Sequence, residues 1–173
     1  MKQCLVRLLL ALSLFVTAHT PINAQQPDPE KLPPARNIPG LTAPDSFPGG
    51  CVDCHINMPE RKQDERLSIL MAQWRQKVRP ELLMKAQAVA PAGIKLKGMH
   101  PASPKALESV PNNCKLCHTK ESKMAPPLAA LIHTIHLTGE QNQFLTTFQG
   151  ECTHCHKFAA ATGSWNMPSG PEK

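Results

Sequence analysis

Cys51-Val-Asp-Cys54-His55 is the first of three Cys-x-x-Cys-His segments in this chain. The others are Cys114-Lys-Leu-Cys117-His118 and Cys152-Thr-His-Cys155-His156. This pattern is the attachment signature of a c-type haem, in which both thiols bond to the porphyrin and the adjacent histidine binds the iron. The sequence therefore predicts three covalently attached haems c, with His55, His118 and His156 as proximal iron ligands.

A lone Cys-x-x-Cys has other readings, namely a redox dithiol or half of a zinc site. Three copies, each followed directly by histidine, favour haem attachment over both. Removal of an N-terminal signal would leave only the six motif cysteines, so none remains for a structural disulfide.

The first 24 residues are typical of a secretory signal peptide. Lys2 and Arg7 precede an apolar run over residues 8–16, and Ala24 is a suitable cleavage position, with Ala18 as the second choice. The run is shorter than the roughly 20 residues of a membrane span. We therefore predict export to the periplasm, with an extracellular or complex-associated location as alternatives, and no integral span after cleavage.

Cleavage after Ala24 leaves 149 residues, enough for one domain. Residues 25–50 hold seven prolines and predict an extended segment that serves as a tether or wraps the first haem. Residues 51–173 form the predicted trihaem domain.

Haem propionates would offset the net positive charge of the polypeptide, so that charge does not indicate nucleic-acid binding. The bias of residues 61–97, nine basic against three acidic, could steer an acidic redox partner or simply mark a solvated helix face.

Apolar periodicity predicts a helix over residues 60–79, with Leu67, Leu70 and Trp74 on one face. A second helical segment is expected over residues 81–90 and a third over residues 128–137, which Pro126-Pro127 opens and Gly139 ends. No strand pattern of any length is visible. The fold class predicted is mainly α with much irregular structure, organised around three closely packed haems.

Three further histidines match the three sixth coordination positions: His100, His133 and His136. A fourth, His154, lies inside its own attachment motif and is poorly placed to reach an iron. His133 and His136 are three residues apart on one predicted helix, roughly 4.5 Å along its axis, so they would serve two different haems. His100 lies in a loop, and neighbouring Met99 is its rival as a ligand.

The segment Leu131-Ile-His133-Thr-Ile-His136, with Gly139 and the third motif, resembles the decahaem outer-membrane and periplasmic c-type cytochromes over about residues 128–157. The resemblance implies low-potential haems with two histidine ligands, closely stacked, and distal histidines on one segment that bind different haems. It does not extend to metal reduction.

The predicted function is single-electron transfer between a donor and an acceptor, such as cytochromes, a reductase or an oxidase, without enzymatic activity. Two alternatives stay open: a haem enzyme that reduces a small oxyanion at an open iron site, and a subunit docked in a larger redox complex. Against the enzyme, no attachment motif ends in lysine and the chain has no tyrosine.

Overall fold

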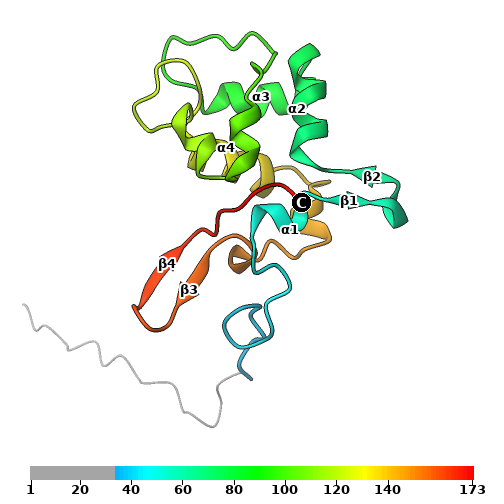
Figure 1. Cartoon of the computed structure of the whole chain (residues 1–173), viewed down its shortest axis with the longest axis vertical. Helices are drawn as coiled ribbons and strands as arrows, with labels where there is room; N and C mark the ends of the chain where they lie inside the picture. The colour runs from blue at the N-terminus through cyan, green and yellow to red at the C-terminus, as the bar shows by residue number, and fades with distance from the viewer. Residues whose placement is uncertain (1–33) are drawn as a thin grey trace, which may run out of the picture. The chain divides into compact units, whose positions relative to one another are not determined.

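Residues 34–173 are described by a computed structural model, drawn in Figure 1. The predicted signal peptide and the first part of the proline-rich segment lie outside these residues. Arg36–Lys173 forms one compact unit. Its elements in chain order are α1 (Cys51–Cys54), β1 (Asn57–Met58), η2 (Pro59–Arg61), β2 (Gln63–Asp64), α2 (Leu67–Gln76), α3 (Pro80–Ala88), η3 (Pro104–Glu108), η4 (Asn113–Leu116), α4 (Leu128–Leu137), α5 (Gln143–Thr146), η5 (Cys152–His154), β3 (Lys157–Ala159) and β4 (Ser164–Asn166).

Helix α4 spans Leu128–Leu137, which confirms the helix predicted over these residues. Pro127 precedes its first residue with an extended backbone, so the helix cannot begin earlier without strain. Gly139 follows the C-cap with a left-handed φ of 94°, a conformation that glycine adopts without a Cβ penalty. The helix packs against α3 and α5, and Figure 1 shows α3 beside it.

The helix predicted over residues 60–79 is shorter in the structure, where α2 covers only Leu67–Gln76. A hairpin replaces its first turns, with Lys62 left-handed at φ 54° between β1 and β2. The Asp64 carboxylate accepts from the Arg66 backbone at 3.2 Å and from its guanidinium at 2.9 Å. Such local side-chain bonds compete with the helix. The second predicted helix is α3, which starts at Pro80 as its first residue.

Two small antiparallel sheets differ from the prediction that no strand pattern exists. Strands β1 and β2 pair Asn57 with Asp64, and β3 and β4 pair Phe158 with Trp165. Strands of two or three residues are too short to show alternation in a sequence. The described chain therefore combines short helices, little sheet and much irregular structure.

The proline-rich segment, as far as it is described, packs against the third motif. We expected it to act as a tether or to wrap the first haem. Three side chains of residues 36–47 reach partners in or beside the third motif, and the backbone N–H of Gly49 donates to the Asp53 carboxylate in the first motif. The contacts are Arg36 to Glu151 at 2.8 Å, Lys157 to Asp45 at 3.0 Å, and Phe47 to His154 with ring centroids 4.7 Å apart.

The apolar core of the polypeptide is small. Within residues 34–173 the buried apolar side chains are Val52, Ala106, Val110, Pro111 and Pro126. Full burial of one valine side chain stabilises a fold by about 1.5–3 kcal/mol. The few buried side chains together therefore contribute far less free energy than the conformational entropy of the whole chain costs on folding. The side chains of the described residues thus supply little of a buried apolar core.

We predict that the haem-free protein does not unfold cooperatively. A variant with all six motif cysteines changed to serine should show no sharp thermal transition by far-UV circular dichroism, whereas the haem-loaded wild type should show one. As a control for the loss of the thiols, the wild-type chain is also produced in a host that does not attach haem. A cooperative transition in both haem-free forms would contradict this prediction.

Candidate haem site

The three Cys-x-x-Cys-His motifs adopt the same local geometry. Each contains one short helical turn, in α1, η4 or η5, and the motif histidine lies one or two residues beyond the end of that turn. The backbone N–H of each histidine donates to the carbonyl of the first cysteine of its motif. These bonds are His55 to Cys51 at 2.8 Å, His118 to Cys114 at 3.0 Å and His156 to Cys152 at 2.8 Å. Each turn thereby presents two thiols and one imidazole together.

The thiols do not have the properties of a redox dithiol. No disulfide joins any two of the six described cysteines. Burial raises the pKa of the Cys51 and Cys54 thiols to about 11, and it also raises the pKa of Cys114 and Cys155. Redox-active Cys-x-x-Cys pairs instead need a lowered pKa, because the thiolate is the nucleophile and the metal ligand. The environment of the first motif, where burial raises the pKa of both thiols, therefore does not favour the redox-dithiol reading.

Each motif histidine faces one of the three histidines predicted as distal ligands. His55 lies opposite His136 with ring centroids 6.2 Å apart, and the corresponding separations are 6.1 Å for His118 and His100 and 6.0 Å for His156 and His133. Within residues 34–173, no group of three or more His, Cys, Asp or Glu side chains converges as a metal cage would require. The histidines thus meet in pairs.

The separation within each pair suits two imidazoles that bind one metal ion from opposite sides. Metal–imidazole bonds of about 2 Å place the two ligating nitrogens about 4 Å apart. The ring centroids lie farther apart than these nitrogens by one ring diameter, which gives a separation of the observed size. The six histidines and six cysteines therefore fit three haems, each with two thioether bonds and two axial nitrogens.

Backbone carbonyls hold the outer ring nitrogen of four of these histidines. A carbonyl oxygen only accepts, so each Nδ1 donates its proton and the other ring nitrogen, Nε2, stays free for a metal. Such outer hydrogen bonds fix both the tautomer and the ring orientation of a ligand. The bonds run from His55 to Glu65 at 2.8 Å, His118 to Pro126 at 2.7 Å, His100 to Pro101 at 2.8 Å and His136 to Ile132 at 3.0 Å.

Burial also favours the ligand form of two predicted distal histidines. It lowers the pKa of His100 and of His136, because the charged imidazolium loses solvation in the protein interior. Both side chains are therefore neutral at neutral pH, and a neutral imidazole is the form that binds metals.

Helix α4 connects the first and third motifs. His136 faces His55 of the first motif, and His133 faces His156 of the third. The two motifs also adjoin each other, since a Cβ built on Gly50 would lie 3.8 Å from the Cys155 carbonyl oxygen. One rigid helix thus sets the spacing of two candidate haem sites.

The candidate site of the second motif depends on a loop. The ring planes of His100 and His118 are nearly parallel, with an angle of 14° between them. The backbone N–H of His100 donates to the Trp74 carbonyl at 2.9 Å, which fixes the loop to α2. The rival ligand, Met99, has 57% of its surface exposed. The geometry therefore favours His100 over Met99 as the residue opposite His118.

His154 is placed differently from the other six described histidines. It is 6% exposed, and its ring is surrounded by the edges of Phe47, Phe144 and Phe148. Its Nδ1 has no hydrogen-bond partner among the described residues. An aromatic cluster thus encloses His154, in agreement with its exclusion from the predicted ligands.

Sequence reasoning missed the side chains that hold the end of α4. Lys85 Nζ donates to the carbonyls of Ile135 at 3.2 Å and Thr138 at 2.7 Å. Asn142 donates to the same two carbonyls at 2.6 and 3.0 Å. These bonds satisfy acceptors left free at the helix C-terminus, directly beside His136. No local signal reveals Lys85, because it comes from α3, about fifty residues earlier.

Comparison with protein-family models, with curated proteins and with solved structures finds no match to this chain. Among residues 34–173 there is no helix whose length and apolar character would let it cross a membrane.

We predict that Lys85→Met lowers the free energy of unfolding of the haem-loaded protein by about 1–2 kcal/mol, because it leaves helix-end carbonyls without a charged donor. A thermal or denaturant melt followed at the haem absorption band measures this. Lys95→Met is the matched control, since Lys95 is exposed and makes no side-chain hydrogen bond within the described chain. Equal losses in the two variants would show that Lys85 does not support α4.

Proposed function

We propose that this chain is an exported trihaem c-type cytochrome that carries single electrons between redox partners in a respiratory chain. The observation that supports this best is the pairing of each motif histidine with one non-motif histidine at 6.0–6.2 Å. Two histidine ligands fill both axial positions of an iron. Such a site exchanges electrons and has no free position for a substrate.

In this proposal each residue has a structural task toward the cofactor. The six motif cysteines hold three haems c covalently, and the six paired histidines bind the irons. Haem iron supplies the one-electron chemistry. The chain fixes ligand geometry, haem spacing and access of solvent.

The partners proposed are a donor and an acceptor, such as cytochromes, a reductase or an oxidase, and the location proposed is the periplasm. Nucleic acid is not among the proposed partners. A free carrier and a subunit docked in a larger complex would use the same sites.

The alternative of an oxyanion reductase requires one iron with an open position. His100 is the ligand whose loss would create it, because it alone comes from a loop. His100 faces His118, and its ring donates to the Pro101 carbonyl. This placement gives the enzyme alternative no support.

We predict that carbon monoxide leaves the spectrum of the reduced wild-type protein unchanged. His100→Ala should convert one haem of three to a carbon monoxide-binding form, because it frees one axial position. Met99→Ala is the control and should behave as wild type.

Binding by the wild type would instead favour the enzyme alternative. Binding by Met99→Ala but not by His100→Ala would assign the ligand to Met99. Haem content, measured as the pyridine complex, tests the number of haems independently.

A further inference from the structure

Three basic residues lie on the two segments that adjoin the predicted distal ligand of the second motif. Arg75 and Lys77 come from the end of α2, and Lys97 comes from the loop that carries His100. Two backbone bonds hold these segments together, from Val78 to the Gly98 carbonyl at 2.8 Å and from His100 to the Trp74 carbonyl at 2.9 Å. We call Arg75, Lys77 and Lys97 the His100 patch.

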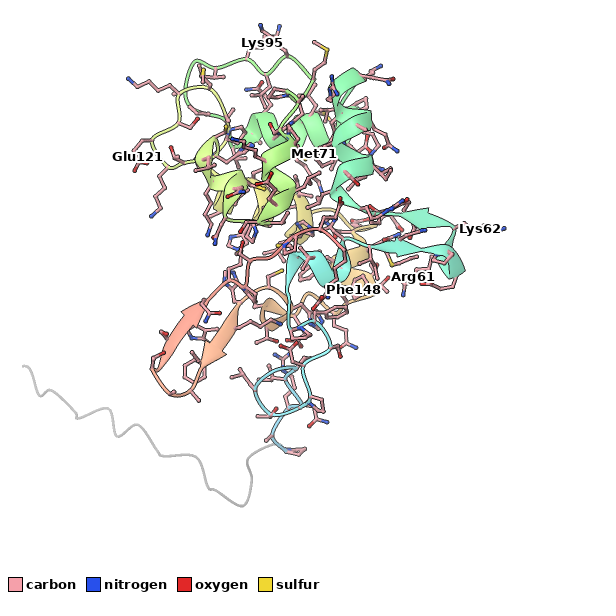
Figure 2. All side chains as sticks on the ribbon, in the orientation of Figure 1. Arg61, Lys62, Met71, Lys95, Glu121 and Phe148 are labelled. Atoms are coloured by element: carbon pink, nitrogen blue, oxygen red, sulfur yellow. The ribbon has the colours of Figure 1, made fainter. Side chains whose placement is uncertain are left out.

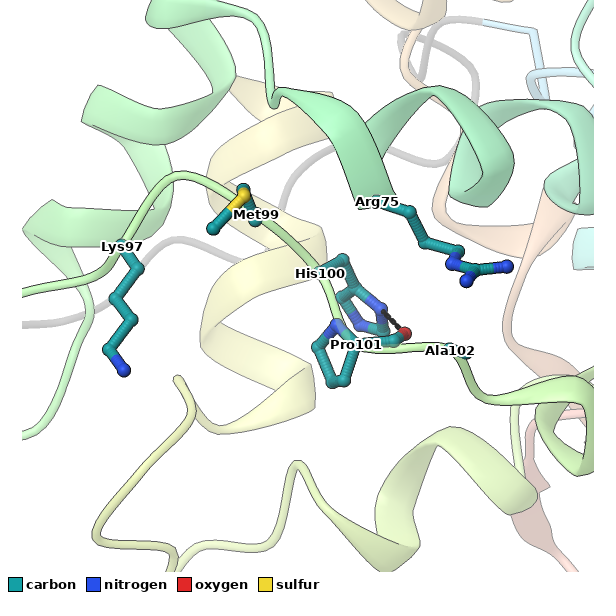
Figure 3. Close-up of a pocket in the computed structure, with 6 residues that line it drawn as sticks. All are labelled: Arg75, Lys97, Met99, His100, Pro101 and Ala102. Atoms are coloured by element: carbon teal, nitrogen blue, oxygen red, sulfur yellow. Dashed lines mark hydrogen bonds between the residues drawn. The ribbon is translucent and has the colours of Figure 1, made fainter.

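A pocket of about 390 Å³ opens within this patch. Its lining includes Arg75, Lys97, Met99 and His100 and no carboxylate, and Figure 3 shows His100 between Arg75 and Lys97. Met99 adds an exposed apolar side chain beside the two cations. Arginine and methionine are both enriched in protein–protein interfaces.

The cations of the His100 patch are unpaired in the described chain. All three are exposed, and none forms an ion pair or a side-chain hydrogen bond within residues 34–173. The acidic group nearest in sequence, Glu81, is already used, because it pairs with Arg79. The patch therefore carries uncompensated positive charge.

The other two motifs differ in this respect. Carboxylates of the chain neutralise the cations beside them. The pairs are Lys173 with Asp53 at the first motif, and Lys157 with Asp45 and Arg36 with Glu151 at the third. Positive charge thus remains unbalanced at one of the three candidate haem sites.

We propose that the His100 patch is the docking surface for an acidic redox protein, and that electrons pass between this partner and the haem attached at Cys114 and Cys117. This inference rests on the proposed function. Complementary charge steers such encounters and raises the association rate, and salt weakens it by screening. One electron passes per encounter: the donor metal centre loses it and one ferric haem iron becomes ferrous.

The test uses a reduced plant-type [2Fe–2S] ferredoxin as an acidic one-electron donor and the haem-loaded full chain as acceptor. Anaerobic stopped-flow mixing measures the second-order rate at ionic strengths from about 0.01 to 0.5 M. The patch variant is Arg75→Gln with Lys97→Gln. The matched control is Arg61→Gln with Lys62→Gln, which removes the same charge at the β1–β2 hairpin, where Figure 2 labels both residues.

The patch variant should react about three- to tenfold more slowly than wild type at low ionic strength, and the two rates should converge at high ionic strength. The control variant should stay within about twofold of wild type throughout. Equal slowing of both variants would overturn the proposal, because net charge alone would then explain the rates.

Midpoint potentials of all variants provide a second measurement. Slowing that does not depend on salt, together with a shifted potential in the patch variant, would show that these cations act on the haem itself and would also overturn the proposal. Haem content distinguishes a wrong docking surface from a wrong function. A wild-type chain without three haems would contradict the proposed function, whereas a chain with three haems leaves only the docking surface to be tested.

Discussion

Helix α4 places two histidines opposite two different motifs, and contacts at its beginning and its end hold it in position. Its N-terminus is fixed to the second motif, because Leu128 donates to the His118 carbonyl at 3.0 Å. Its middle carries His133 and His136, and its end is held by Lys85 and Asn142. A single short helix therefore contacts or faces all three motifs. A shift of α4 would change the geometry of at least two candidate haem sites at once.

This dependence explains why a chain with so few buried apolar side chains can have a defined arrangement. Backbone carbonyls orient four of the six paired imidazoles, and short turns orient the motif histidines through their own first cysteines. Hydrogen bonds to the backbone thus set the orientation of these imidazole rings. Covalent cofactors that fill the space between paired histidines would complete the core, as the proposed function requires.

Charge is distributed unevenly over the three candidate sites. Carboxylates within the chain balance the cations at the first and third motifs, whereas Arg75, Lys77 and Lys97 beside His100 are unpaired in the described chain. In the proposed cytochrome, the sites joined by α4 would form a closely spaced pair, and the site of the second motif would meet the partner.

The sequence by itself determined the three attachment motifs, the candidate ligands and helix α4, because each of these depends on residues close together in the chain. The helix predicted over residues 60–79 was too long. Apolar periodicity contains no information about the Asp64–Arg66 contact or the left-handed backbone of Lys62, which end the regular helix early. Only the tertiary structure decided which histidine faces which motif, that Lys85 caps α4, and that residues 36–47 contact the third motif. These pairings join residues that lie tens of positions apart, and local propensity carries no information about which distant segments meet.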